Sequence, residues 1–220
     1  MSGHGRRMND ETETPSDTRR QIDIVRHVRD QPPTAGPDWV STEEPLEIRV
    51  LFHGADGKRK DRSLSITMRT PGDDRELAVG FLMSGGIIHD PGDVEDVQWC
   101  GPTVEGQSST NQLTVHLAAA VNLNMADLQR HFYTTSSCGV CGTASMEAVR
   151  SKIAQTAISG GPVVSSDLIY DLPQRLRDAQ SVFDSTGGLH AAGLLDNRGQ
   201  LIELKEDVGR HNALDKLLGS

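Results

Sequence analysis

The chain has few aromatic residues, which make up 4% of its 220 positions, and little positive charge, with 22 Lys and Arg against 31 Asp and Glu. The net charge of −9 argues against a general nucleic-acid-binding protein, because such proteins present a basic surface to the phosphate backbone. An anionic small ligand would need a local basic pocket, since the overall field repels it. The scarcity of aromatics leaves few large side chains to anchor a core.

The sequence also has no long apolar run and few cysteines. No segment approaches the ~18–20 apolar residues of a membrane span. The N-terminus carries Arg6, Arg7, Asp10 and Glu11 with no apolar stretch behind them, unlike a secretory signal. Three cysteines make a poor disulfide framework. These absences predict a cytoplasmic protein with no membrane span and no nucleic-acid partner.

The order of apolar and polar residues predicts a mixed α and β protein. Residues 1–40 are polar or proline-rich and are predicted to be a disordered tail, with one short strand near 22–28. Alternation and helical spacing then predict strands at 45–52, 64–68, 94–99, 112–117, 191–195 and 200–204, and helices near 77–82, 125–132, 144–157, 166–178 and 207–218. A seam near Thr134 divides an N-terminal α+β domain, 41–134, from a second domain, 135–220.

The segment Cys138-Gly139-Val140-Cys141-Gly142 is the clearest candidate for chemistry. Its glycines free the backbone around both thiols. Cys141 precedes a predicted helix, and the positive end of that helix favours a thiolate. A nucleophile, a redox pair, a metal ligand, a sulfur carrier and an inert pair all remain open for Cys138 and Cys141.

Metal and redox interpretations of this segment find little support elsewhere in the sequence. A structural zinc site needs about four ligands, usually in two close pairs, and there is no second C-x-x-C. No histidine is followed by Glu two positions on, which excludes the zinc deaminase signature. A thioredoxin-like motif follows a buried strand, whereas 132–137 is a weak strand at best. We therefore expect no metal site.

The segment Phe183–His190 has two adjacent glycines, Gly187 and Gly188, after Thr186. Backbone amides of such a loop can hold an anion, and His190 would point a titratable group toward it. The alternative is a simple turn that enters a strand, with His190 at its edge.

Polar residues are also dense in the segment Lys205–Asn212, where a predicted strand meets a helix. Such junctions collect ligands in α/β folds. Asp207 and His211 are four apart and would share a helix face, and Arg210 is able to bind phosphate or carboxylate bidentately. The alternative is an acidic cap on a surface helix, with His211 buried above Leu214 and Leu218.

Taken together, these segments resemble the formate dehydrogenase accessory sulfurtransferases, the FdhD family, from about Trp39 to Gly219. The resemblance is carried by Glu44-Pro45-Leu46-Glu47-Ile48, Gly80-Phe81-Leu82, Ser136-Ser137-Cys138-Gly139-Val140-Cys141-Gly142, Thr186-Gly187-Gly188-Leu189-His190 and Glu206-Asp207-Val208-Gly209-Arg210-His211-Asn212-Ala213-Leu214-Asp215-Lys216. The last motif is long enough to be highly specific.

The resemblance implies a sulfur carrier that takes a persulfide from a cysteine desulfurase. It would pass the sulfur to the bis-molybdopterin guanine dinucleotide molybdenum cofactor of formate dehydrogenase. Cys138 would bear the persulfide and Cys141 would be its partner. The resemblance further implies a homodimer and a cytidine-deaminase-like layered α/β fold for the second domain, without a zinc site. The predicted cofactor contacts are Gly187, Gly188, His190, Asp207, Arg210 and His211.

The sequence departs from the family pattern at two places. Family members usually have Glu before the glycine that corresponds to Gly86, whereas this chain has Gly85. The family also continues for several dozen residues beyond the position of Ser220, including a glycine-rich stretch that holds part of the cofactor site. We therefore expect the sulfur-transfer domain, 135–220, to be shorter here.

Overall fold

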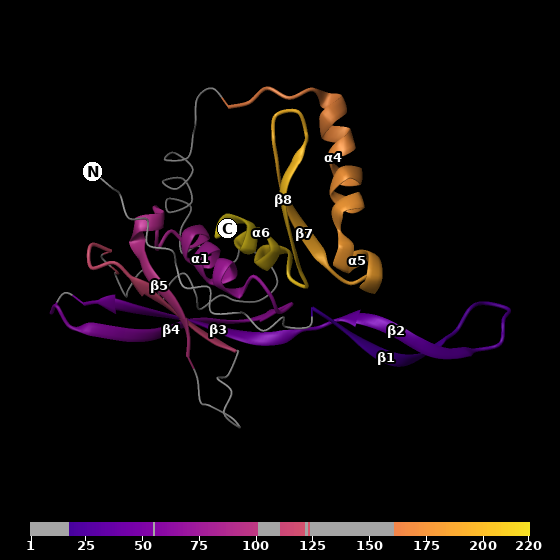
Figure 1. Ribbon diagram of the computed structural model, residues 1–220, viewed down its shortest axis with the longest axis horizontal. Coiled ribbons are helices and arrows are strands. Elements are labelled where there is room, and N and C mark those ends of the chain that lie inside the picture. Colours follow the sequence, from indigo (N-terminus) through magenta and orange to yellow (C-terminus); the bar gives the residue numbers. More distant parts are fainter. Residues whose placement is uncertain (1–17, 55, 101–110, 122, 124–160) are drawn as a thin grey trace, which may run out of the picture.

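The computed structural model describes residues 18–54, 56–100, 111–121, 123 and 161–220 (Figure 1). Its centre is a four-stranded sheet with the order β4-β3-β6-β5. The strands are β3 (Glu44–His53), β4 (Arg59–Arg69), β5 (Val94–Trp99) and β6 (Gln112–Leu117). The central pair, β3 and β6, is parallel and the two outer pairs are antiparallel. The mixed α and β fold predicted from the sequence is confirmed.

The alternation that predicted β3 corresponds to one buried face of the sheet. Leu46, Ile48, Val50 and Phe52 are almost fully buried, while the residues between them are partly exposed. Helix α1 (Asp74–Ser84) covers this face with Leu77, Ala78 and Leu82. One continuous core therefore joins the sheet to α1; β6 adds Leu113, Val115 and Leu117, and Val97 and Ile88 complete it.

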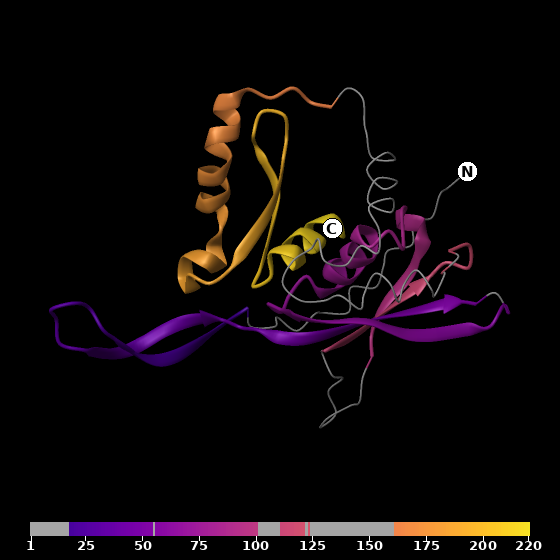
Figure 2. The ribbon, with the colours of Figure 1, turned by 180° about the vertical axis from the view of Figure 1, so that it is seen from behind.

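The C-terminal elements form a hairpin flanked by helices. Strands β7 (His190–Leu195) and β8 (Leu201–Asp207) are antiparallel and correspond to the strands predicted at 191–195 and 200–204, with a short turn at 196–199 between them. Helix α4 (Ser166–Ala179) runs alongside this hairpin in both views (Figures 1 and 2). The short helix α5 (Ser181–Thr186) leads into β7, and α6 (Arg210–Leu218) follows β8. The predicted helices at 125–132 and 144–157 lie outside the described residues.

Helix α6 packs closely on α1, although the two come from opposite sides of the predicted domain seam (Figure 1). A Cβ atom on Gly80 of α1 would overlap the carbonyl of Asp215, and one on Gly219 would overlap the carbonyl of Glu76. Glycine at both positions therefore permits the close approach of the two helices. The seam at Thr134 lies outside the described residues, so the division into domains stays a prediction.

The tail predicted for residues 1–40 is wrong for its second half. Strands β1 (Arg19–Arg26) and β2 (Thr34–Ser41) pair antiparallel along their length and extend away from the central sheet (Figure 1). The side chain of Arg26 forms an ion pair with Asp38 at 3.0 Å, and Arg19 lies over the Trp39 ring. Main-chain pairing and these cross-strand contacts order a segment whose composition is typical of a tail.

The structure also bears on the membrane prediction. Among the residues described, no helix is long and apolar enough to cross a membrane.

Candidate functional site

The register of β7 and β8 brings two of the predicted site segments together. His190, the first residue of β7, lies opposite Asp207, the last residue of β8. The Thr186–His190 loop and the Arg210–His211 start of α6 are therefore at the same end of this hairpin, away from its 196–199 turn. Proximity of these segments, which the sequence alone does not show, follows directly from strand pairing.

Most of the predicted cofactor contacts at this end are exposed. Gly187, Gly188, His190, Arg210 and His211 all present surface to solvent. Gly187 ends α5 with φ of +68° and has open space where a side chain would lie. A Cβ on Gly188 would lie 3.3 Å from Ser41 Oγ, so the loop passes close to the end of β2. The exposed residues at this end thus include one arginine and two histidines, on a chain of net charge −9.

Asp207 differs from the other predicted contacts because it is 0% exposed. Its Oδ1 accepts hydrogen bonds from Gly209 N at 2.8 Å and Asn212 Nδ2 at 3.0 Å, and its Oδ2 accepts one from Thr70 N at 3.1 Å. Oδ2 also lies 2.8 Å from Lys216 Nζ. Both oxygens are thus fully used, and no surface remains for a ligand. We correct the prediction for Asp207 from cofactor contact to structural anchor.

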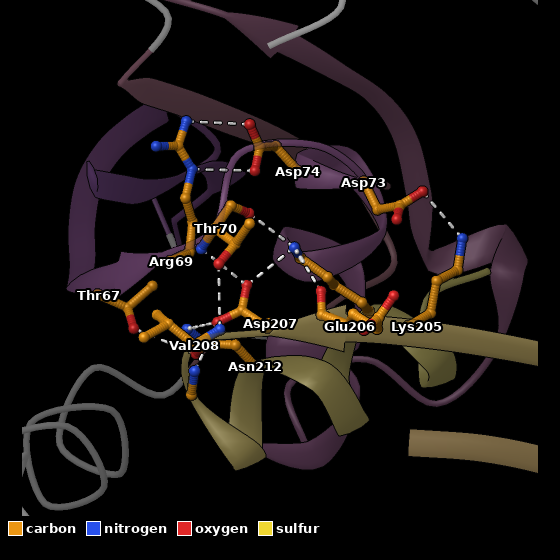
Figure 3. Close-up of polar contacts among 12 residues, drawn as sticks. Thr67, Arg69, Thr70, Asp73, Asp74, Lys205, Glu206, Asp207, Val208 and Asn212 are labelled. Atoms are coloured by element: carbon orange, nitrogen blue, oxygen red, sulfur yellow. Dashed lines mark hydrogen bonds and ion pairs between the residues drawn. The ribbon is translucent and has the colours of Figure 1, made fainter. Parts of the chain in front are cut away.

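Thr70, in the turn between β4 and α1, forms hydrogen bonds with Asp207 and with residues near it (Figure 3). Its N–H donates to Asp207, its Oγ1 accepts from Val208 N at 3.1 Å, and its carbonyl accepts from Lys216 Nζ at 2.8 Å. Asn212 adds bonds to Met68 O at 2.8 Å and Thr67 Oγ1 at 3.2 Å. The start of α6 is therefore bound to the end of β4 by buried polar contacts.

Further ion pairs surround this anchor (Figure 3). The buried guanidinium of Arg69 binds both oxygens of Asp74, at 3.1 and 3.0 Å, and reaches Glu44 at 3.2 Å. Lys205 lies 2.9 Å from Asp73. Burial tends to lower the pKa of Lys205, but the hydrogen bond from Lys205 to Asp73 and the charge of Asp73 outweigh it, and the pKa lies above its ordinary 10.5. The charge of Asp73 on the β4–α1 turn is thus matched by the charge of Lys205 on β8.

The buried face of α6 differs from that of the alternative interpretation, in which His211 is buried above Leu214 and Leu218. Its buried residues are Asn212, Ala213, Asp215 and Lys216, whereas Leu214 is 47% and Leu218 42% exposed. His211 is exposed rather than buried above these leucines. Asp207 also ends β8 instead of sharing a helix face with His211, because α6 begins at Arg210. The helix faces inward with its polar side because β8 and the β4–α1 turn supply partners there.

Asp215 lies on this buried face, beside α1. Its burial raises the pKa of the carboxyl to about 6, while a hydrogen bond from Ser84 acts in the opposite direction. The side chain is therefore an ionisable group kept largely out of water at the contact between two helices.

Glu206 is a residue that the sequence reasoning did not assign to the site. Its Oε1 accepts the N–H of Phe183 at 2.8 Å and its Oε2 that of Val182 at 3.0 Å. These amides open α5, the helix that leads to the Gly187-Gly188 loop. The only signal in the sequence is the dense run of polar residues at the end of β8, which does not distinguish Glu206 from its neighbours.

The predicted catalytic pair, Cys138 and Cys141, lies outside the described residues. Cys100 is described; it is half-buried after β5, with its Sγ 2.9 Å from Thr114 Oγ1. Within the described ranges there is no group of three or more His, Cys, Asp or Glu side chains arranged to hold a metal ion.

Comparison with known proteins identifies a matching family and several relatives that share one name. The model of the FdhD/NarQ family matches residues 42–220. The sulfur carrier protein FdhD of Streptomyces coelicolor is 47% identical over 197 residues, covering 89% of this chain and 67% of that protein. The protein of the same name from Saccharolobus solfataricus is 38% identical over 200 residues, covering 91% and 68%. The chain thus spans about two thirds of the length of these relatives.

A solved structure shows the same fold. It is the crystal structure of a protein from Desulfotalea psychrophila described as a formate dehydrogenase accessory protein, with a TM-score of 0.58 and 20% identity. The match covers 92% of this chain and 66% of that one. With the match of the family model over most of the sequence, these findings lead to one conclusion: the chain belongs to the FdhD/NarQ family.

Proposed function

We propose that this protein is a sulfur carrier for formate dehydrogenase. The observation that carries the proposal is a C-x-x-C segment at Cys138 and Cys141 in a chain whose relatives, matched over 89% of it, are named sulfur carriers. The sulfur donor is a cysteine desulfurase and the acceptor is the bis-molybdopterin guanine dinucleotide cofactor of the molybdenum enzyme. The carrier acts in the cytoplasm as a homodimer, and its second domain has the cytidine-deaminase-like layering of its family.

The loading step needs only the thiolate of Cys138. The thiolate attacks the outer sulfur of the persulfide on the desulfurase, the sulfur–sulfur bond of that persulfide breaks, and the desulfurase cysteine leaves as its thiolate. The outer sulfur then resides on Cys138 as a persulfide. No oxidant is consumed, because one persulfide is exchanged for another. Cys141 assists as the neighbouring thiol.

The exposed end of the β7–β8 hairpin is the proposed surface for the anionic acceptor. Arg210, His190 and His211 supply positive or protonatable groups there, and Gly187 and Gly188 allow close backbone approach. A local basic surface is what an anion requires on a chain of net charge −9. Asp207 contributes indirectly, because it holds the start of α6 in place.

Intact-mass spectrometry tests the proposal. The purified chain is incubated with a cysteine desulfurase and free cysteine, alongside Cys138→Ala and Cys141→Ala variants. We expect a gain of about 32 Da in the wild type, reversed by reductant and absent from Cys138→Ala. No gain in a folded wild-type chain would reject the carrier and favour a scaffold that binds cofactor or enzyme. A reversible loss of about 2 Da without sulfur gain would indicate a Cys138–Cys141 dithiol oxidoreductase instead.

A further inference from the structure

We propose that Glu206 is a positioning residue for the Thr186–His190 loop and that it acts through the backbone of α5. The inference rests on the proposed function in one respect: the binding role of the loop belongs to that function. The geometry that links Glu206 to the loop is independent of it.

Glu206 provides a cap that α5 lacks in its own sequence. The first amides of a helix have no acceptor within the helix. The N-cap residue of α5, Gln180, makes no side-chain capping bond. The two oxygens of Glu206 instead accept the N–H groups of Val182 and Phe183, at 3.0 and 2.8 Å. A carboxylate at this place also matches the positive end of the helix.

The carbonyl groups of the same two residues, Val182 and Phe183, accept hydrogen bonds from the end of α5 and the start of the loop. Val182 O accepts bonds from Ser185 Oγ at 2.8 Å and Thr186 Oγ1 at 2.9 Å. Phe183 O accepts the N–H of Gly187 at 2.6 Å. A continuous series of hydrogen bonds therefore runs from the carboxylate of Glu206, through one turn of helix, to the first glycine of the loop.

The position of Glu206 in β8 explains why this series matters to the whole site. Successive residues of a strand point to opposite faces. Glu206 accordingly reaches α5 on one face, while Asp207 reaches Thr70 and Lys216 on the other. The end of β8 thus fixes both the glycine loop and the start of α6. The position of Gly187 relative to Arg210 therefore depends on Glu206 and Asp207.

Hydrogen exchange of the backbone amides tests this role in Glu206→Gln. A carboxamide has one acceptor oxygen, and its NH₂ group faces the second N–H, so one of the two bonds is lost. We expect exchange in residues 181–190 to accelerate about tenfold, while α1 and β3 keep their protection. Glu203→Gln is the matched control, because Glu203 lies in the same strand and pairs with Lys205 and Ser220. It should leave 181–190 unchanged.

Two further readouts separate positioning from general stability. Glu206→Asp retains the charge with a shorter reach, and its exchange in 181–190 should lie between those of the wild type and Glu206→Gln. Affinity for guanosine diphosphate, measured by calorimetry, should fall about fivefold or more in Glu206→Gln, while persulfide loading of Cys138 stays at the wild-type level.

Unchanged exchange in 181–190, or equal acceleration across α1 and β3, would overturn the role of Glu206. Failure of the wild type to bind guanosine diphosphate or to load sulfur would instead reject the proposed function. The exchange measurement would still decide the role of Glu206 in that case.

Discussion

The carboxylate of Asp207 lies 2.8 Å from the ammonium of Lys216, and the two side chains are 0% and 1% exposed. Lys216 also donates to the carbonyls of Thr70 at 2.8 Å and Glu206 at 3.4 Å. All three of its N–H groups therefore have acceptors, and the four hydrogen-bonding positions of Asp207 are filled. The pair joins α6 to the β4–α1 turn inside the protein.

Lys216→Met should strongly destabilise the protein, because it leaves the charge of Asp207 buried without its ion-pair partner. We expect a loss of about 3–5 kcal/mol in the free energy of unfolding, measured by urea denaturation. Lys58→Met, at an exposed turn position, is the control and should change stability by about 0.5 kcal/mol or less. A similar small effect of Lys216→Met would mean that the pair contributes little to the fold.

Gly80→Ala should separate α1 from α6, since the new Cβ would overlap the carbonyl of Asp215. The expected cost is about 3 kcal/mol or more, seen as a lower midpoint in thermal unfolding. Gly36→Ala in β2 is the matched control and should leave the midpoint nearly unchanged, because nothing lies within 4 Å of its Cβ position. If both variants unfold at the wild-type temperature, the close contact of the helices is absent in solution.

Asp215→Asn should stabilise the protein at neutral pH. The pKa of Asp215 in the folded state is raised to about 6 from its ordinary 3.8, so the folded state prefers the protonated form. The stability that this preference contributes is present below pH 3.8 and is lost as the pH rises through about 6. The substitution should therefore gain about 1–3 kcal/mol at pH 7.5 and almost nothing at pH 4.

Urea denaturation at several pH values measures this dependence, with Asp23→Asn on the exposed face of β1 as the control. A gain that is the same at pH 4 and pH 7.5 would show that the charge of Asp215 is not its cause.

Arg210→Ala should weaken binding of guanosine diphosphate by about tenfold without lowering the unfolding temperature, because the side chain is exposed at the proposed anion surface. Arg198→Ala removes an exposed arginine from the opposite end of the same hairpin and keeps the net charge of the two variants equal. Calorimetry measures the affinity of both variants for guanosine diphosphate. Equal affinities would remove Arg210 from the binding surface.

Local pattern in the sequence predicts the elements that are buried on one apolar face. The alternation from Pro45 to Phe52 is enough to place β3, and the turn at 196–199 between two apolar runs is enough to place β7 and β8. The long motif from Glu206 to Lys216 identifies the family, because it is contiguous and needs no knowledge of the fold. These features depend on neighbours along the chain.

The role of individual residues within that motif depends on partners far away in the sequence. Asp207, Asn212 and Lys216 are polar, and Asp207 was predicted to contact the cofactor, but Thr70 and the end of β4 provide hydrogen-bonding partners for them inside the protein. The same contacts turn Leu214 and Leu218 outward on α6.

Composition likewise predicted a tail for residues 1–40, whereas β1 and β2, within residues 19–41, pair with each other. The sequence by itself therefore determined strands β3 to β8, the family and the candidate residues. Only the tertiary structure decided which of these residues are anchors and which face a ligand, because burial and hydrogen-bond partners come from segments more than a hundred residues apart.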